Sequence, residues 1–288
     1  MTEHEQPASR HWPALLYIRA HVTVSNVAVA VVMGWLALLA IDVDVFGLGI
    51  EPPSPLWGRL YNDGPVEWLQ WFLLAGAVFA AAYLASRLWS LHASHAARFF
   101  TLLSIGAALM LIEDAGDIRH ELGRYVVDTF GSRVAGLPIN LFAEVPYFAA
   151  LAAVPIYAVI RYGSAPWQVS GVRPYLVGAY GLYGLAAASS SLRVVGGNYT
   201  RLGAWIDETI LGARWPSAPG ETTAHAHFYL VDGPIEESIE VLAAACLFAL
   251  VLAFTAAVRR GEVVGGAVAD DQRPNGSQGG ADIPRGGQ

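Results

Sequence analysis

The segment PIEESIEVLAAACLFALVLAFTAAV, residues 234–258, carries three glutamates in its first seven positions and no charged residue after them. An α-helix rises 1.5 Å per residue, so about 20 apolar residues cross the roughly 30 Å hydrocarbon layer of a bilayer. The segment is long enough and apolar enough to span a membrane as a helix. It predicts an integral membrane protein with acidic side chains near one surface of the bilayer.

Five more segments share this length and apolar character. The six predicted spans are 22–41, 66–86, 98–118, 139–160, 174–194 and 234–258. The first is longer than the apolar part of a signal peptide, so we expect it to be retained as an anchor. The sequence thus predicts an all-α, polytopic bundle of six transmembrane helices over residues 13–261. The polar ends, 1–12 and 262–288, are predicted to be disordered cytoplasmic tails.

The composition supports this fold class and excludes several functions. Hydrophobic residues make up 55% of the chain and charged residues 14%, whereas soluble domains carry roughly 25% charged residues. All 17 basic residues are arginines, and without lysine neither a retinal Schiff base nor a pyridoxal-phosphate aldimine can form. The net charge of −7 argues against a nucleic-acid partner. The single Cys246 excludes an intrachain disulfide.

Arginine placement predicts the orientation of the chain in the membrane. With six spans, the side that holds both termini carries eight arginines near span ends, and its internal loops, 87–97 and 161–173, are short. The other side carries seven, spread over the longer loops 42–65, 119–138 and 195–233. Because short cytoplasmic loops concentrate arginine and lysine, we expect a cell-membrane protein with both termini in the cytoplasm.

Two parts of the chain resemble each other. DGPVEWLQWFLLAGAVFA at 63–80 aligns without gaps with DGPIEESIEVLAAACLFA at 232–249. Both copies open a span that enters from the outer side. This pattern predicts an internal repeat in which helices 1 and 2 recur as helices 5 and 6. Convergence is the alternative, because Gly-Pro begins many helices and apolar helices resemble one another.

The acidic residues gather at one end of the predicted spans. Odd spans end on the outer side and even spans begin there, so their acids meet in the outer part of the bilayer. The residues are Glu67, Glu113, Asp114, Asp117, Glu144, Glu236, Glu237 and Glu240. A charged side chain at the centre of a lipid-facing helix costs roughly 2.5–3.5 kcal/mol on insertion scales. Such a cluster therefore requires protons, a cation or arginine partners.

Helical spacing predicts which of these residues act together. Glu113, Asp117, His120 and Arg124 are spaced 4, 3 and 4 apart and would form one stripe on a continuous helix. We predict Glu113, Asp117, Glu144 and Glu240 as catalytic acids and bases. A divalent metal ion accepts carboxylate and imidazole ligands, so Asp117, His120, Glu236 and Glu240 are the predicted metal ligands. His225 and His227 precede the last span and could supply further ligands.

A structural role is the alternative for many of these acids. Carboxylates in the first turn of a helix favour its dipole, which applies to Glu67, Glu236 and Glu237. That explanation does not apply to Glu113, Asp114 and Asp117, which close a helix at its C-terminal end. Pairing with Arg119, Arg124 or Arg193 is the form that a structural role would take for them. Asn140 and the serines 189–191 could line the same cavity, although serine also packs helices together.

Three classes of function remain open at this point. The first is a membrane enzyme that acts on a lipid or isoprenoid, through a metal ion or through carboxylates acting as acid and base. The second is a proton- or cation-coupled transporter or channel, because intramembrane acids are typical of such proteins. The third is a non-catalytic membrane subunit or scaffold. Convergence of the acids around a cavity that is closed on the inner side would favour the enzyme.

Overall fold

The computed structural model describes residues 12–40, 60–61, 64–134, 137–193, 197–213, 215 and 222–263. The predicted tails fall outside this part of the chain, apart from Trp12, Glu262 and Val263. The long elements are α1 (Trp12–Leu39), α3 (Pro65–Ser90), α4 (Ser94–Gly116), α6 (Ile139–Tyr162), α8 (Arg173–Leu192) and α11 (Glu236–Arg259). The shorter helices are α5 (Ile118–Phe130), α7 (Ser164–Trp167), α9 (Asn198–Ile206), η2 (Asp207–Leu211), α10 (Thr223–Leu230) and η3 (Val231–Ile235). A two-residue ladder pairs β1 (Arg133–Val134) with β2 (Leu137–Pro138) in antiparallel register.

The chain is a helical membrane bundle, as its composition predicts. Five helical stretches are long and apolar enough to cross a membrane: Leu16–Leu38, Pro65–Ser90, Ser94–Gly116, Leu141–Tyr162 and Thr223–Arg259. They match five of the six predicted spans. The remaining one, 174–194, forms α8, which stands within the bundle beside α11 but is not among those five. A count of six spans therefore stays a prediction.

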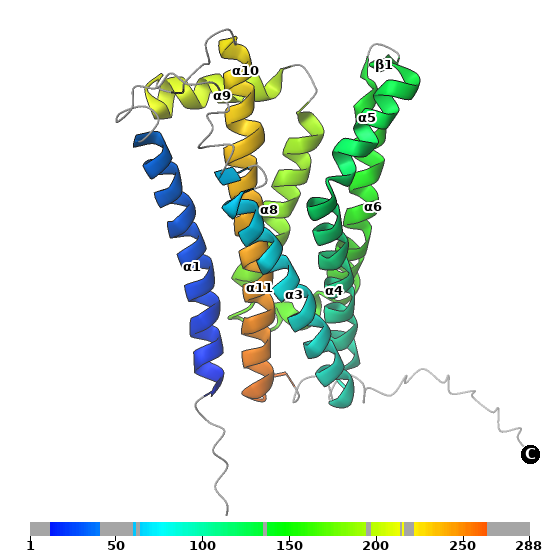
Figure 1. The fold of residues 1–288 in the computed structure, drawn as a ribbon. Coiled ribbons are helices and arrows are strands. Elements are labelled where there is room, and N and C mark those ends of the chain that lie inside the picture. The colour runs from blue at the N-terminus through cyan, green and yellow to red at the C-terminus, as the bar shows by residue number, and fades with distance from the viewer. Residues whose placement is uncertain are drawn as a thin grey trace, which may run out of the picture.

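Helix α11 is the centre of the bundle, and α1, α3 and α8 pack around it (Figure 1). It is apolar on every side beyond Glu240, as a helix must be when neighbours surround it. Alanines at 243–245, 249, 253, 256 and 257 are all buried along it. Small side chains let helix backbones approach closely, which is how helices associate inside lipid.

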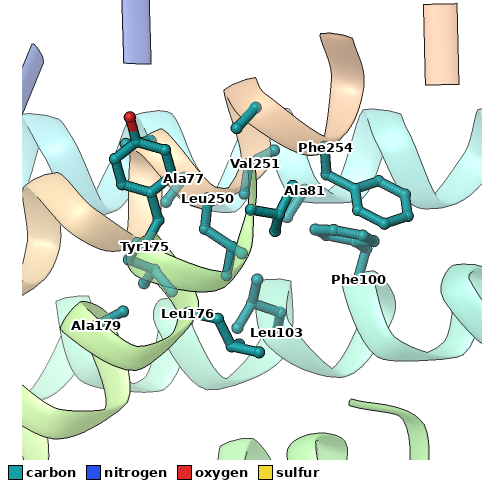
Figure 2. Packing of buried hydrophobic residues seen from close by; sticks show 14 of the residues in the cluster. Ala77, Ala81, Phe100, Leu103, Tyr175, Leu176, Ala179, Leu250, Val251 and Phe254 are labelled. Atoms are coloured by element: carbon teal, nitrogen blue, oxygen red, sulfur yellow. The ribbon is translucent and has the colours of Figure 1, made fainter. Parts of the chain in front are cut away.

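The core layer in the half of the bundle away from α5 and α9 is tightly packed (Figure 2). Phe100 of α4 contacts Phe254 of α11 with ring centroids 4.6 Å apart. Leu176 and Ala179 of α8 and Ala77 and Ala81 of α3 complete this layer.

The outer surface of the bundle is apolar where lipid would surround it. Phe72 and Phe79 of α3 are each 76% exposed, and Val29, Met33 and Ile160 are also exposed. A soluble monomer rarely exposes so much contiguous apolar surface, whereas hydrocarbon solvates it at no cost. The exposed face therefore supports a membrane location.

The end of the bundle that carries α5, α9 and α10 departs from the simple loops that the sequence predicts. The predicted loop 195–233 contains α9, η2 and α10. Helix α10 continues through η3 into α11, so Thr223–Arg259 forms one helical stretch of 37 residues. The last span was predicted to begin at Pro234, but this proline lies inside the π-helical turn η3. Its counterpart Pro65 starts α3 instead, and the internal repeat remains a prediction.

The predicted stripe from Glu113 to Arg124 is interrupted. Helix α4 ends at Gly116, Asp117 adopts a left-handed conformation with φ 46° and ψ 36°, and α5 begins at Ile118. Residues before and after this break no longer follow one helical spacing. The prediction of a single continuous stripe is therefore wrong, because a left-handed residue re-aims the chain at Asp117.

Candidate functional site

A cavity of about 240 Å³ lies between α3, α4, α6, α8 and α11. Most of its wall is apolar, with Leu103, Pro155 and Leu247 toward the middle of the bundle. Most of its polar side chains come from the parts of α3, α4, α8 and α11 nearest α5 and α9: Gln70, Glu113, Asp114, Tyr183, Ser190 and Glu240. Tyr180 also lines the cavity, and its hydroxyl donates to the Pro155 backbone oxygen over 3.0 Å. The cavity therefore has an acidic end and an apolar remainder.

Gln70 organises the acidic end. Its Nε2 donates to Asp114 Oδ2 over 2.9 Å and to Glu240 Oε2 over 3.2 Å. Gln70 is only 2% exposed, and its helix α3 packs against both α4 and α11. One amide thus holds two carboxyl groups from different helices at the same wall of the cavity.

Two buried polar atoms at this wall have no hydrogen-bond partner within the described part of the chain. They are Gln70 Oε1 and the Tyr183 hydroxyl oxygen. A buried polar group without a partner costs about 1–3 kcal/mol, so native structures satisfy nearly all of them. Both residues line the cavity, but these two atoms are themselves inaccessible to a water-sized molecule, so neither faces its open space.

A second group of hydrogen bonds adjoins the cavity at Glu236. Ser190 and Tyr199 both donate to this carboxylate, Tyr199 over 2.8 Å to Oε2. Burial and the neighbouring Glu236 hold the pKa of Tyr199 well above its usual range, so its hydroxyl stays protonated and donates. Tyr199 belongs to α9, which lies across the end of the bundle (Figure 1). Glu236 therefore ties α9 and α8 to α11.

Arg119 lies close to these acids. Its Nη1 donates to Ser190 Oγ over 3.1 Å, and its guanidinium stacks 5.5 Å from the ring centre of Phe148. Burial alone would lower the pKa of Arg119, but the carboxylates around it, Glu236 first among them, outweigh burial and raise it. Arg119 therefore keeps its positive charge beside the cavity.

Glu144, a predicted catalytic residue, takes part in an ion-pair network rather than in the cavity wall. Its Oε1 lies 3.4 Å from Arg193 Nη2, and Arg193 Nη1 lies 3.3 Å from Asp232 Oδ1. Glu144 is buried on α6, Arg193 caps α8 and Asp232 lies in η3. One guanidinium thus joins three elements, an arrangement that fits a structural role.

The predicted site residues do not all meet. Glu113 and Glu240 line the cavity, and Glu236 adjoins it through Ser190. The side chain of Asp117 is 57% exposed and lies 3.9 Å from Arg124 at the α4–α5 break. The side chain of His120 lies outside the described part of the structure.

The predicted metal site has no counterpart in the described part of the chain. Among the described residues, no group of three or more His, Cys, Asp or Glu side chains could hold a metal ion. Because His120 is a predicted ligand whose side chain is not described, the divalent metal remains a prediction. Metal analysis of the purified protein would test it directly.

His227, a further candidate ligand, has a different partner. Its Nε2 lies 3.1 Å from Asp207 Oδ2, and both side chains are buried. The other carboxylate oxygen, Asp207 Oδ1, accepts from the Trp215 backbone N–H over 2.8 Å. This pair joins η2 to α10 and lies outside the cavity wall. His225 is exposed, and its backbone N–H is capped by Thr222.

The cavity reaches the outer surface of the bundle between α6 and α8. Ile156 of α6 and Gly184 of α8 both line it and are both exposed. A Cβ atom added at Gly184, or at Gly181 one turn earlier, would meet no atom within 4 Å. The wall is therefore thin on the side that faces lipid.

Sequence reasoning did not select Gln70, Asp114 or Tyr183 as site residues. The sequence did contain an indication for Gln70, because it is a polar residue inside a mostly apolar span and lies one helical turn from Glu67. Asp114 was grouped with Glu113 but not chosen. Tyr183 had no signal, because tyrosine is common in membrane helices.

No protein-family model matches this chain, and no curated protein or solved structure is significantly similar to it.

Proposed function

We propose that this chain is a multi-pass membrane enzyme that acts by general acid–base catalysis on a lipid or isoprenoid dissolved in the bilayer. The observation that carries the proposal is the pair of carboxyl groups, Asp114 and Glu240, held by Gln70 at one end of a mostly apolar cavity. An apolar substrate fits the remainder of the cavity. Its reacting atoms would then lie against two groups that can exchange protons.

Two carboxyl groups at one wall can act as general acid and general base in the same reaction. One, in its acid form, gives a proton to the substrate, while the other, as carboxylate, takes a proton from it. The reaction leaves the total number of protons on the pair unchanged. Glu113 lines the same cavity and is the candidate for restoring a proton to either group.

The distribution of charge supports an enzyme over a transporter. Of the described residues that line the cavity, those with ionisable carboxyl groups all lie at the end near α5 and α9. Leu103, Pro155 and Leu247 line it farther into the bundle, and the Tyr180 hydroxyl there donates to the Pro155 backbone oxygen, whereas a conducting path would need a chain of polar groups. With the termini in the cytoplasm, as the arginine pattern predicts, the acidic end is on the extracytoplasmic side.

The alternative of a non-catalytic scaffold is supported by the ion pairs of Arg193, which lie outside the cavity wall. Arg193 pairs with Glu144 and Asp232, which accounts for two of the acids by structure alone. That pairing does not extend to Asp114 or Glu240, which both accept from the neutral amide of Gln70. We therefore assign the structural role to the Arg193 network and the chemistry to the cavity.

Deuterium transfer tests the proposal without knowledge of the substrate. The purified protein is placed in nanodiscs with lipids extracted from the membranes of its source organism, in D₂O, and the lipids are analysed by mass spectrometry. We expect at least one lipid to gain non-exchangeable deuterium or to be converted. The effect should vanish in Glu240→Gln and persist in Glu121→Gln, whose side chain is exposed. Identical lipid profiles with and without the protein would refute acid–base catalysis on these lipids.

A further inference from the structure

We propose that the cavity binds an amphiphile with one apolar chain and a head that donates hydrogen bonds and carries no negative charge, such as a hydroxyl or an amine. This inference rests on the proposed function and names the class of its substrate. It follows from the polar atoms at the acidic end, from their charges, and from the size and opening of the cavity.

The free hydrogen-bonding capacity at the acidic end is mostly that of an acceptor. Asp114 and Glu240 accept from Gln70 through one oxygen each, Oδ2 and Oε2. Each carboxyl group has a second oxygen, and Glu113 adds a third carboxyl group to the same wall. A carboxylate oxygen only accepts hydrogen bonds. A hydroxyl or amine head supplies an O–H or N–H to these oxygens.

The charge at this end disfavours an anionic head. Glu113, Asp114 and Glu240 line the cavity, and no arginine or histidine is among the described residues of its wall. The nearest guanidinium belongs to Arg119, which already binds Ser190 and lies among several carboxylates. A carboxylate, phosphate or sulfonate head would be placed beside the carboxylate of the Asp114–Glu240 pair, a like charge, in a medium of low dielectric constant.

The cavity is too small to enclose a whole lipid. Pockets that enclose drug-sized ligands measure about 300–1,000 Å³, whereas this one measures about 240 Å³. The head and the first part of a chain fit, and the remainder must leave the bundle. The thin wall at Ile156 and Gly184, between α6 and α8, opens toward the lipid tails. We place the exit of the single apolar chain there.

Photo-crosslinking with matched amphiphiles tests this selectivity. Three probes share one diazirine-bearing alkyl chain and differ only in the head: an alcohol, a primary amine or a sulfonate, which is anionic at any working pH. The full chain in nanodiscs is irradiated with each probe, and labelled peptides are identified by mass spectrometry. We expect the alcohol, the amine or both to label α6 and α8 at least about tenfold more than the sulfonate, equivalent to about 1.4 kcal/mol. Which of the two labels more identifies the head.

Equal or stronger labelling of α6 and α8 by the sulfonate would overturn the inference, as would absence of labelling there by all three probes. Gln70→Leu removes the donor that holds Asp114 and Glu240 at the wall and should reduce labelling by the preferred probe. Met110→Trp should fill the cavity from α4 and reduce it as well. Phe79→Leu on the outer face of α3 is the control for both. Each variant is compared only if it elutes as the wild-type species and melts cooperatively.

The same samples separate this inference from the proposed function. If a donor-headed probe labels the cavity but no lipid gains deuterium, the ligand class stands and the catalytic proposal fails. If lipids gain deuterium but the sulfonate probe is preferred, catalysis stands and the ligand class is wrong.

Discussion

Asp114 of α4 and Glu240 of α11 accept hydrogen bonds from the same nitrogen atom, Gln70 Nε2 of α3. The acidic end of the cavity thus exists only when three helices are assembled. Neither carboxyl group is satisfied by its own helix, and neither lies in the first turn of α11 or at an N-terminus, where the helix dipole would explain an acid. This shared donor distinguishes Asp114 and Glu240 from Glu144 and Asp232, which pair with Arg193.

Substitution of either cavity carboxyl should stop the chemistry. We expect Glu240→Gln and Asp114→Asn each to lower deuterium transfer by about 10²-fold or more, the usual contribution of a positioned acid or base. Both variants keep the size and hydrogen-bonding shape of the side chain, so the bundle should still assemble. Rates within a factor of two of wild type in both variants would contradict the assignment of the site.

Removal of Arg193 should weaken the fold more than removal of an exposed arginine. Its side chain is 11% exposed and contacts Glu144 and Asp232, so Arg193→Gln removes this cation from the buried Glu144 carboxylate and from the partly buried Asp232. Loss of one partner of a buried ion pair costs about 3–5 kcal/mol. Arg124, 64% exposed, also contacts two acids, Asp117 and Glu121. Exposed pairs contribute about 0–1 kcal/mol, so Arg124→Gln should change the melting temperature little. Equal melting temperatures for the two variants would disprove the structural role of Arg193.

A bulky residue at position 184 should block access to the cavity and leave the bundle intact. An added Cβ atom at Gly184 meets nothing within 4 Å, so the backbone has room for a side chain. Gly184→Trp places an indole ring at the thin wall between α6 and α8. We expect loss of photo-labelling and of deuterium transfer with an unchanged melting temperature. Gly178→Trp is the contrasting variant, since a Cβ atom there would lie 2.9 Å from Cys246 Sγ and the helices would have to separate. Full labelling in Gly184→Trp would rule out access by this route.

The sequence predicted the fold class because hydropathy and helix length decide it. Five predicted spans correspond to helices long and apolar enough to cross a membrane, and the acids of α4 and α11 that were expected near one surface do lie at one end. The assumption of continuous helical spacing was wrong at Asp117. The dipeptide Gly116-Asp117 was the available signal, because both residue types tolerate left-handed or turn conformations.

The cavity itself could not be predicted from spacing along one helix. Its acidic end needs side chains from α3, α4, α8 and α11, and their mutual register depends on how the helices pack. Glu113 and Glu240 were found because they are charged residues inside apolar segments. Gln70 was missed because its neutral side chain indicates a site only through its hydrogen bonds to Asp114 and Glu240, and these depend on how the helices pack. Glu144 was chosen as one of the acids at the outer end of the spans, and nothing in the sequence showed that Arg193 would pair with it.

The backbone at Asp117 makes a prediction about stability. A left-handed φ of 46° is tolerated by asparagine and glycine but is unfavourable for a β-branched residue. We expect Asp117→Asn to melt at the wild-type temperature and Asp117→Val to melt several degrees lower. Thermal melting in one detergent measures both. If valine is tolerated as well as asparagine, α4 and α5 do not meet at a left-handed residue.

Cysteine labelling tests the orientation that the arginines predict. Phe130 at the end of α5 and Trp205 of α9 are exposed at the end of the bundle that holds the acids. Ser164 of α7 is exposed at the opposite end, beside the short arginine-bearing loop. The native Cys246 is buried and gives a low background. In intact cells an impermeant thiol reagent should label Phe130→Cys and Trp205→Cys, while Ser164→Cys should react only after lysis. The reverse pattern would place the acidic end of the cavity on the cytoplasmic side, where its substrate would be drawn from the inner leaflet.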